Sequence, residues 1–305
     1  MSESGRYVIV SPCRDEARYM VRTLDSVARQ TRPPDLWVVV DDGSSDDTPR
    51  ILARYAERLP YLRVVRRDDR GRRSVGPGVI EAFSAGYRTV EADSFEYLCK
   101  LDLDLELPPR YFETLIARME AEPRLGSCSG KPYAPHDDGV PTIERSGDEM
   151  SVGMTKFYRT SCFREIGGFQ PHVMWDGIDC HRCRMLGWSA KSFDDPELRF
   201  LHLRPMGSSE GGIWRGRWRH GTGQWFMGTS LSFMSASAIS RAFEPPRVTG
   251  ALAMWLGYVT SMLKRAPRLD EPEFRAFVRR YQREALLLGK RRATQRIERR
   301  VMARR

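Results

Sequence analysis

The sequence predicts an α/β protein whose mostly parallel central sheet is flanked by helices and followed by a helical C-terminal extension. In the first hundred residues, short apolar runs that suit strands alternate with helical patterns. Two of these runs end in acidic turns, and beyond residue 205 the pattern changes to uncharged segments and a basic tail. Alternating strands and helices are typical of a right-handed parallel sheet with helices on its faces.

Four strands are predicted in the first hundred residues, at 7–11, 36–41, 62–66 and 95–102. Apolar residues recur at helical spacing after the first and the second of them: Met20, Leu24, Val27 and Ala28, then Ile51, Leu52 and Tyr55. The second helix follows Asp47-Thr48-Pro49, and proline suits the first turn of a helix. From 109 to 205 the pattern is mixed, with helices near 110–120 and 179–187 and strands near 126–129 and 198–202.

Three further helices are predicted in the C-terminal third. Residues 221–240 and 248–263 carry no formal charge, and we expect both to cover the core or to rest on a bilayer surface. Insertion as a hairpin is the less favoured alternative, because the first segment is rich in Gly, Ser and Thr and the second falls short of the ~20 residues that a spanning helix needs. The third helix, 271–289, is amphipathic and basic, which suits packing on the domain or contact with a membrane.

Two acidic turns follow predicted strands. The second strand leads into Asp41-Asp42-Gly43-Ser44, and the fourth into Asp102-Leu103-Asp104. In open α/β sheets, ligands bind at the edge formed by the carboxyl ends of the strands. Carboxylates are hard ligands that suit Mg²⁺ or Mn²⁺ and leave coordination positions for a diphosphate. We therefore expect a metal and phosphate site at this edge.

The net positive charge of the chain comes from its C-terminal segment. Residues 264–305 contain 15 Lys and Arg against 5 Asp and Glu, a surplus that equals the net charge of +10 of the whole chain. Such a segment suggests an anionic partner, either an anionic membrane surface or, less favoured, nucleic acid. Six cysteines and a start that does not resemble a secretory leader favour a cytoplasmic protein, peripheral on the inner face of the cytoplasmic membrane.

Five short motifs resemble those of glycosyltransferase family 2 and occur in the order of that family. They are Ser11-Pro12-Cys13-Arg14-Asp15-Glu16, Asp41-Asp42-Gly43-Ser44, Lys100-Leu101-Asp102-Leu103-Asp104, Gly167-Gly168-Phe169, and Trp175-Asp176-Gly177-Ile178-Asp179 ending at Gly187-Trp188. The resemblance implies a GT-A fold and an inverting transferase that uses a nucleotide-diphosphate sugar. It also implies a nucleotide-sugar-binding half at 1–108, an acceptor-binding half at 109–205, and a lid and basic helical extension at 206–305.

The resemblance assigns the donor site. Asp42 is expected to pair with the edge of the nucleotide base, and because a carboxylate can accept from N–H groups of uracil or of guanine, it does not by itself select the donor. The other residues expected to contact the nucleotide sugar are Ser11, Pro12, Asp15, Arg72, Arg73, Lys100, Asp102 and Arg204.

A divalent cation, Mn²⁺ or Mg²⁺, is expected beside the donor diphosphate. The resemblance places Asp104 on the metal and Asp102 on the ribose or a metal-bound water. His202 follows a late strand and is a third candidate ligand, while the neighbouring Arg204 is expected to meet the phosphates. Imidazole suits Mn²⁺ better than Mg²⁺.

The reaction needs a base that takes the proton of the attacking hydroxyl group. Aligning Gly187-Trp188 with the family's glycine-aromatic pair places Asp176 on the base, and Trp175 stands where the family has Glu. This departure leaves Asp179 open as the alternative base, with Asp176 favoured.

We therefore expect a metal-dependent inverting glycosyltransferase that adds a single sugar, with a UDP-sugar favoured as donor, to a glycan or lipid-linked acceptor in envelope or exopolysaccharide synthesis. Processive synthases carry Gln-x-x-Arg-Trp, whereas this chain has Arg217-Trp218 without the glutamine. Two alternatives stay open. A sugar-phosphate nucleotidyltransferase typically begins with a glycine-rich loop, which Ser11 to Asp15 lack. A nucleic-acid-binding protein would explain the tail but neither acidic turn.

Overall fold

A seven-stranded sheet forms the centre of the molecule in the computed structural model, which describes residues 5–69, 71, 76–136, 140–144, 146–204, 212–243 and 246–303. Its strand order is β10-β6-β9-β4-β1-β2-β3. The strands are β1 (Tyr7–Cys13), β2 (Leu36–Asp41), β3 (Leu62–Arg66), β4 (Tyr97–Leu101), β6 (Leu125–Ser129), β9 (Thr155–Arg159) and β10 (Ser189–Ser192). Only β9 runs antiparallel to its neighbours, β4 and β6. The predicted mostly parallel sheet is confirmed.

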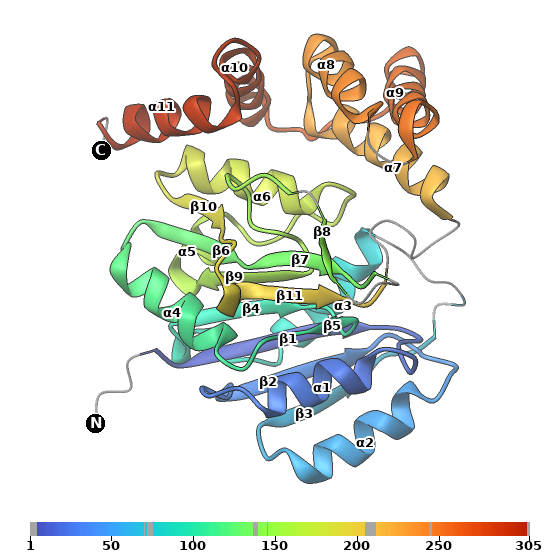
Figure 1. Cartoon of the computed structure of the whole chain (residues 1–305), viewed down its shortest axis with the longest axis vertical. Coiled ribbons are helices and arrows are strands. Elements are labelled where there is room, and N and C mark those ends of the chain that lie inside the picture. Colours follow the sequence, from blue (N-terminus) through green and yellow to red (C-terminus); the bar gives the residue numbers. More distant parts are fainter. Residues whose placement is uncertain are drawn as a thin grey trace.

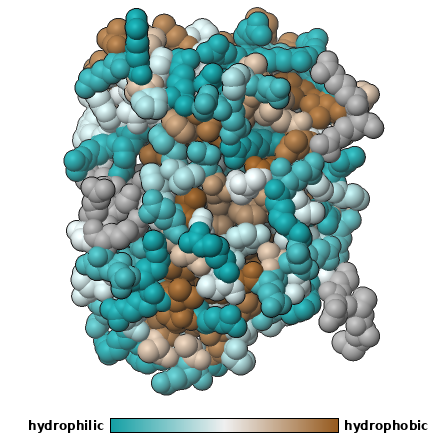
Figure 2. Space-filling model, turned by 180° about the vertical axis from the view of Figure 1, so that it is seen from behind, coloured by the Kyte–Doolittle hydropathy of each residue, from teal (hydrophilic) through white to brown (hydrophobic). Residues whose placement is uncertain are grey.

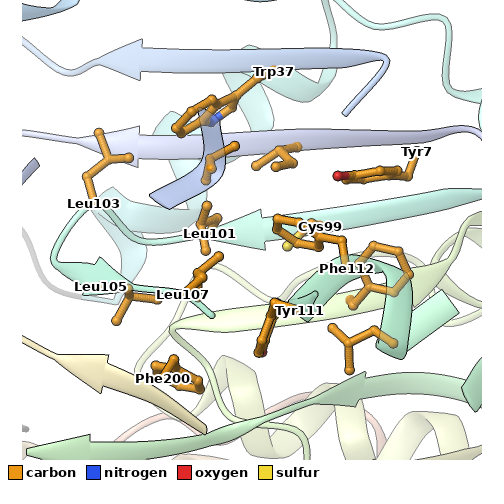
Figure 3. Close-up of a cluster of buried hydrophobic side chains, with 14 of the residues drawn as sticks. Tyr7, Trp37, Cys99, Leu101, Leu103, Leu105, Leu107, Tyr111, Phe112 and Phe200 are labelled. Atoms are coloured by element: carbon orange, nitrogen blue, oxygen red, sulfur yellow. The ribbon is translucent and has the colours of Figure 1, made fainter. Parts of the chain in front are cut away.

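Successive side chains of the strands enter two separate cores, as the two-residue period of a strand requires. Tyr7 and Ile9 of β1 belong to one cluster, whereas Val8 and Val10 belong to the other. Figure 3 shows the first cluster, in which Trp37, Leu101 and Phe112 lie among side chains from both sheets. The sheet is therefore buried on both faces, which explains the continuous apolar runs in the sequence.

Helices cover both faces of the sheet (Figure 1). Residues of α1 (Met20–Ala28), α2 (Thr48–Arg58) and α4 (Tyr111–Ala121) complete the first cluster. Residues of α3 (Pro77–Tyr87), α5 (Thr160–Glu165) and α6 (Trp175–Met185) complete the second. Two 3-10 turns, η1 (Ala92–Ser94) and η2 (Pro196–Leu198), precede β4 and β11.

A smaller sheet lies beside the carboxyl end of β4. Its order is β5-β11-β7-β8, with β5 (Leu105–Glu106), β7 (Lys131–Ala134), β8 (Thr142–Ile143) and β11 (Arg199–His202). Because β5 follows Asp104 directly and His202 pairs in register with Leu105, this sheet brings His202 to the second acidic turn.

A layer of helices lies over α6: α7 (Gly212–Met227), α8 (Leu231–Arg241), α9 (Arg247–Leu263), α10 (Pro272–Leu288) and α11 (Lys290–Met302) (Figure 1). The sequence analysis treated 221–240 as one helix, which is wrong. Gly228 has φ +91° and Ser230 caps a new helix by accepting from the backbone N–H of Phe233. Helix α11 was not predicted, and α6 begins four residues before the start that was predicted for it.

The amphipathic helix predicted at 271–289, α10, uses its apolar face for packing. Phe274 and Val278 form a buried cluster with Ile178 of α6. The rings of Phe274, Phe277 and Tyr281 surround His181 of α6, at centroid distances of 6.3, 6.3 and 5.0 Å. Burial, together with the nearby cations Arg184 and Lys290, lowers the pKa of His181 to about 3. The face that was a candidate for membrane contact is therefore covered by the protein.

Helices α7 and α9 cross at two glycines. A β-carbon on Gly221 of α7 would overlap the carbonyl oxygen of Met254, and one on Gly257 of α9 would overlap that of Trp218. The two backbones approach this closely because neither glycine has a side chain. Within the described ranges, no helix has the length and apolarity that crossing a membrane requires.

Gly221→Ala is expected to destabilise the protein, because the added methyl group forces α7 and α9 apart. Overpacking of this kind typically costs about 1–3 kcal/mol. Urea unfolding would measure the loss, with Ser240→Ala, an exposed change on α8, as the control. Equal midpoints for both variants would contradict the close approach of the two helices.

Candidate functional site

The turns after β1 and β2 are locked to one another. The backbone N–H of Asp15 donates to the Ser44 hydroxyl at 2.9 Å, and that of Ser45 donates to the Asp15 carboxylate at 2.8 Å. One residue on, the N–H of Glu16 donates to Thr48 at 2.9 Å. Asp15 has φ +52°, a strained backbone conformation that these bonds hold in place. The Asp15 carboxylate thus braces the second turn.

Asp42 lies at the end of β2, 5% exposed. Its backbone N–H donates to the Cys13 carbonyl at 2.9 Å. Its carboxylate pairs with Arg67, which follows β3, at 2.7 Å. Arg14 reaches the carbonyl oxygen of Asp42 at 2.9 Å. Arg67 was missed by the sequence analysis, although its place after a parallel strand could have indicated it.

Ser11 and Pro12 lie inside the sheet rather than on its edge. The Ser11 hydroxyl accepts from the indole N–H of Trp37 at 2.9 Å and is fully buried. Pro12 is also buried and pairs in register with Val40. The side chains of both residues therefore support the pocket wall. Arg72 and Arg73, expected at the phosphates, lie outside the described residues.

The Asp-x-Asp turn follows β4 and is held by a buried lysine. Lys100, 1% exposed, contacts the Asp102 carboxylate at 2.5 Å and the Gly153 carbonyl at 3.0 Å. The N–H of Asp102 donates to Met154 at 2.8 Å. The Asp102 side chain is 31% exposed, so one of its faces is open to a ligand.

Arg204 joins the second acidic turn to the turn after β1. Its guanidinium lies 3.2 Å from Asp104 through Nε and pairs with Glu16, in the turn after β1, through Nη2. It also lies over the ring of Tyr19, 5.1 Å from the centroid. The Arg204 guanidinium thus lies beside Asp104, the carboxylate predicted to bind the metal. A positive charge at this place would suit a diphosphate.

His202 faces Asp104 with one nitrogen and Glu144 with the other. Nδ1 lies 2.6 Å from the Glu144 carboxylate, and Nε2 lies 3.9 Å from Asp104. Burial opposes the charged imidazolium, but Glu144 and Asp104 outweigh it and raise the pKa of His202. Since Glu144 holds the proton on Nδ1, Nε2 is oriented as a ligand, an arrangement common in metal sites. Glu144 follows β8, and no sequence pattern pointed to it.

The donor set suits a divalent cation. Within the described residues, no group of three or more His, Cys, Asp or Glu could enclose a metal ion by itself. Asp104 and Nε2 of His202 nevertheless offer oxygen and imidazole ligands on one side, and Asp102 lies two residues away. Phosphate oxygens and water would complete the coordination, as is usual for Mg²⁺ sites that bind phosphates.

Asp176 lies in the first turn of α6, on the other side of Gly153. A β-carbon on Gly153 would lie 3.0 Å from Oδ2 of Asp176, so a side chain there would crowd the aspartate. In the described part of the chain, no residue donates a hydrogen bond to this carboxylate. The carbonyl of Asp176 accepts from Lys156 at 2.7 Å. Asp102, through its backbone N–H, and Asp176, through its side chain, thus both contact the segment that contains Gly153 and Met154.

Asp179, the alternative base, is buried beneath this site at 1% exposure. Its carboxylate binds Lys156 of β9 at 2.5 and 2.6 Å and accepts from the Tyr158 hydroxyl. Burial opposes the charge of Lys156, but Asp179 outweighs it and the lysine pKa is raised. Asp179 is thus buried and paired whereas Asp176 is half-buried, and the choice between them as base stays a prediction. Trp175 covers the lysines, with Lys100 and Lys156 5.1 and 5.6 Å from its ring centroid.

The fold is that of GT-A glycosyltransferases, as two solved structures illustrate. The mannosyltransferase PcManGT from Pyrobaculum calidifontis, solved with GDP-Man and Mn²⁺, matches 98% of this chain and 85% of its own with a TM-score of 0.53 at 19% identity. Residues 1–349 of S. aureus TarS, solved with UDP-GlcNAc, match 97% of this chain and 90% of that chain with a TM-score of 0.54 at 15% identity. The predicted GT-A fold is confirmed.

The sequence profile of glycosyl transferase family 2 matches residues 8–174. A validoxylamine A glucosyltransferase of Streptomyces hygroscopicus subsp. limoneus is 30% identical over 151 residues, 47% of this chain and 31% of that protein. A poly-β-1,6-N-acetyl-D-glucosamine synthase of Staphylococcus epidermidis is 23% identical over 233 residues, 68% of this chain and 52% of that protein. The chain thus spans about a third to a half of these relatives. It belongs to glycosyltransferase family 2.

Lys156→Met is expected to cost about 3–5 kcal/mol of stability, because it leaves the Asp179 carboxylate buried without its cation. Urea unfolding would measure the loss. The matched control is Lys191→Met, which removes a half-exposed lysine that pairs with Glu122 at 2.6 Å and should cost less than about 1 kcal/mol. Equal losses of unfolding free energy in the two variants would show that the buried ion pair stabilises the protein no more than the exposed one.

Proposed function

We propose that this chain is a metal-dependent inverting glycosyltransferase that moves a single sugar from a nucleotide-diphosphate sugar to a hydroxyl group of a glycan or lipid-linked acceptor. The convergence of Asp42, Asp102, Asp104 and Asp176 at one sheet edge, with Arg204 and Lys100 among them, carries this proposal. Carboxylates suit a base edge, a metal and a proton acceptor, while the two cations suit a diphosphate.

Asp176 is the proposed base. It is half-buried at the start of α6, whereas Asp179 is closed off by Lys156 and Tyr158. Its carboxylate takes the proton of the acceptor hydroxyl as the oxygen forms a bond to the anomeric carbon. The bond from that carbon to the diphosphate oxygen breaks, and the nucleoside diphosphate leaves. Attack from the face opposite the leaving group inverts the anomeric configuration.

Asp104 and His202, with Asp102 beside them, are the proposed holders of Mn²⁺ or Mg²⁺. The cation would neutralise charge on the departing diphosphate. Arg204 adds a fixed positive charge at the same place, because Glu16 and Asp104 both orient it. A UDP-sugar is the favoured donor, and Asp42 is the proposed partner of the base edge. Relatives of this chain are named for glucosyl transfer and for N-acetylglucosamine polymer synthesis.

A cytoplasmic position at the inner face of the cytoplasmic membrane belongs to this proposal. Arg279, Arg283 and Arg292 in the basic segment 264–305 are exposed on α10 and α11. The apolar face of α10 packs on α6, so apart from the exposed leucines at the end of α10 these helices would contribute to membrane attraction mainly through charge. Acceptors of envelope or exopolysaccharide synthesis would be met at that surface.

Nucleotide release from a panel of UDP-, GDP- and dTDP-sugars, with Mn²⁺, Mg²⁺ or EDTA, tests the class. We expect slow hydrolysis of one donor that EDTA abolishes and that Asp104→Asn lowers by at least about a hundredfold. Asp47→Asn, an exposed aspartate paired with Arg50, is the matched control and should keep full activity. Absence of turnover together with pyrophosphate release from UTP and a sugar phosphate would instead indicate a nucleotidyltransferase.

Asp176→Asn is expected to lower kcat of transfer by about 10²–10⁴-fold, the usual contribution of a general base, with donor affinity unchanged. Kinetics with the donor found in the panel, and nucleotide titration of the variant, would separate the two quantities. A weaker effect than that of Asp179→Asn in a folded protein would exchange the roles of the two aspartates.

A further inference from the structure

Exposed apolar side chains gather on the C-terminal helical layer. Of the 18 large hydrophobic residues that are exposed in the described structure, ten lie in residues 212–263, so their distribution is far from even. They are Ile213, Trp214, Trp218, Leu231, Ile239, Phe243, Val248, Leu252, Leu256 and Leu263. Figure 2 shows hydrophobic atoms at the upper rim of the molecule, where the C-terminal helices lie. A gathering of this kind marks an interaction surface.

Helix α9 has two apolar faces. One contains Gly250, Met254, Gly257 and Tyr258 and is buried, mainly against α7. The opposite side exposes Val248, Leu252, Leu256 and Leu263, which at 100° per residue fall within one narrow arc. We call these four residues the α9 face. A helix that is apolar all round is normally buried on every side. Leu252 is 51% and Leu263 is 74% exposed, so this side has no cover in the described structure.

Positive charge predominates around the α9 face. In the sequence from 212 to 265 there are seven Lys and Arg and one acidic residue, Glu244. Arg247 and Lys264 stand at the two ends of α9, and both are exposed. A second copy of the chain would bring these like charges together, which disfavours a symmetric dimer. An anionic surface would be attracted along the whole length of the helix.

We propose that the α9 face, with Phe243 at the turn before it, docks on an anionic lipid bilayer surface. Its 17 residues lie along the interface, with leucines in the acyl boundary and the cations at the headgroups. The inference does not depend on the transfer reaction. It places the main hydrophobic contact on α9 and not on the basic segment 264–305.

The docked helix layer is tied to the segment before Asp176. Gly223 of α7 lies so close to this segment that a β-carbon there would be 2.6 Å from Met174 and 3.1 Å from Val173. The ring of Phe226 stacks on His172 with centroids 3.5 Å apart. Because α7 contacts α9 on one side and residues 172–174 on the other, docking of α9 would fix the site at a set height above the bilayer. A lipid-linked hydroxyl group would then meet Asp176 from the membrane side.

Co-sedimentation of the full chain with vesicles tests the proposal, using phosphatidylcholine alone and with a quarter phosphatidylglycerol. Leu252→Gln/Leu256→Gln is compared with Leu286→Gln/Leu287→Gln, two exposed leucines at the end of α10. We expect binding to the anionic vesicles that weakens with salt. It should fall at least about tenfold in the α9 variant and stay unchanged in the α10 variant.

Three results would overturn the proposal: no binding of the wild type, equal binding of both variants, or a wild-type dimer in light scattering that Leu252→Gln/Leu256→Gln dissociates. Unfolding midpoints of both variants, expected to match the wild type or rise, confirm that each is folded. Donor hydrolysis without vesicles is expected to be unchanged in both. A wild type that binds vesicles but hydrolyses no donor would reject the proposed reaction and leave the docking inference standing.

Discussion

The ion pair between Lys156 and Asp179 joins the central sheet to helix α6. The helices of the C-terminal layer and the candidate site both depend on the position of α6. Lys156 stands on β9, and through its other hydrogen bond it fixes the main chain at Asp176. Helix α6 in turn forms the floor for α10 and carries the buried His181. A charged pair is an expensive way to fasten two elements, because both ions lose their water. Here the pair fixes the position of α6 along the sheet. A shift of α6 would displace Asp176, the proposed base.

The donor side of the site is held by opposite charges that neutralise one another in pairs. Arg67 meets Asp42, Lys100 meets Asp102, and Arg204 meets Asp104 and Glu16. The carboxylates thus keep their places before any ligand arrives. The proposed metal and diphosphate would bring both signs of charge at once, so these ion pairs could exchange partners without leaving a charge unpaired. Preorganised polar groups of this kind are what a charged transition state requires.

The parts of the fold that repeat a local pattern could be predicted from the sequence. Three of the four parallel strands, β1, β2 and β4, were found because they are buried on both faces, and the acidic turns because they follow two of these strands. The break at Gly228 was missed because an uncharged run looks helical throughout, and only the packing of α8 beside α9 requires the chain to turn there. Glu144 could not be found, because its partner His202 lies 58 residues away and is brought to it by the smaller sheet. Asp176 and Asp179 differ in burial and in their ion-pair partners, which their spacing in the sequence does not reveal.

The seating of α10 on α6 has a practical consequence for anyone handling this protein. Ile178 and His181 of α6 are kept from water by residues of the last forty, among them Phe274, Val278 and Tyr281. A truncated chain without α10 and α11 would expose an apolar surface on α6, the helix that contains the proposed base. Such a fragment would be prone to aggregate, so a loss of its activity would not test whether the basic segment binds a membrane. Replacing the exposed arginines of α10 and α11 one at a time keeps the packing of α10 on α6 and tests only the effect of charge.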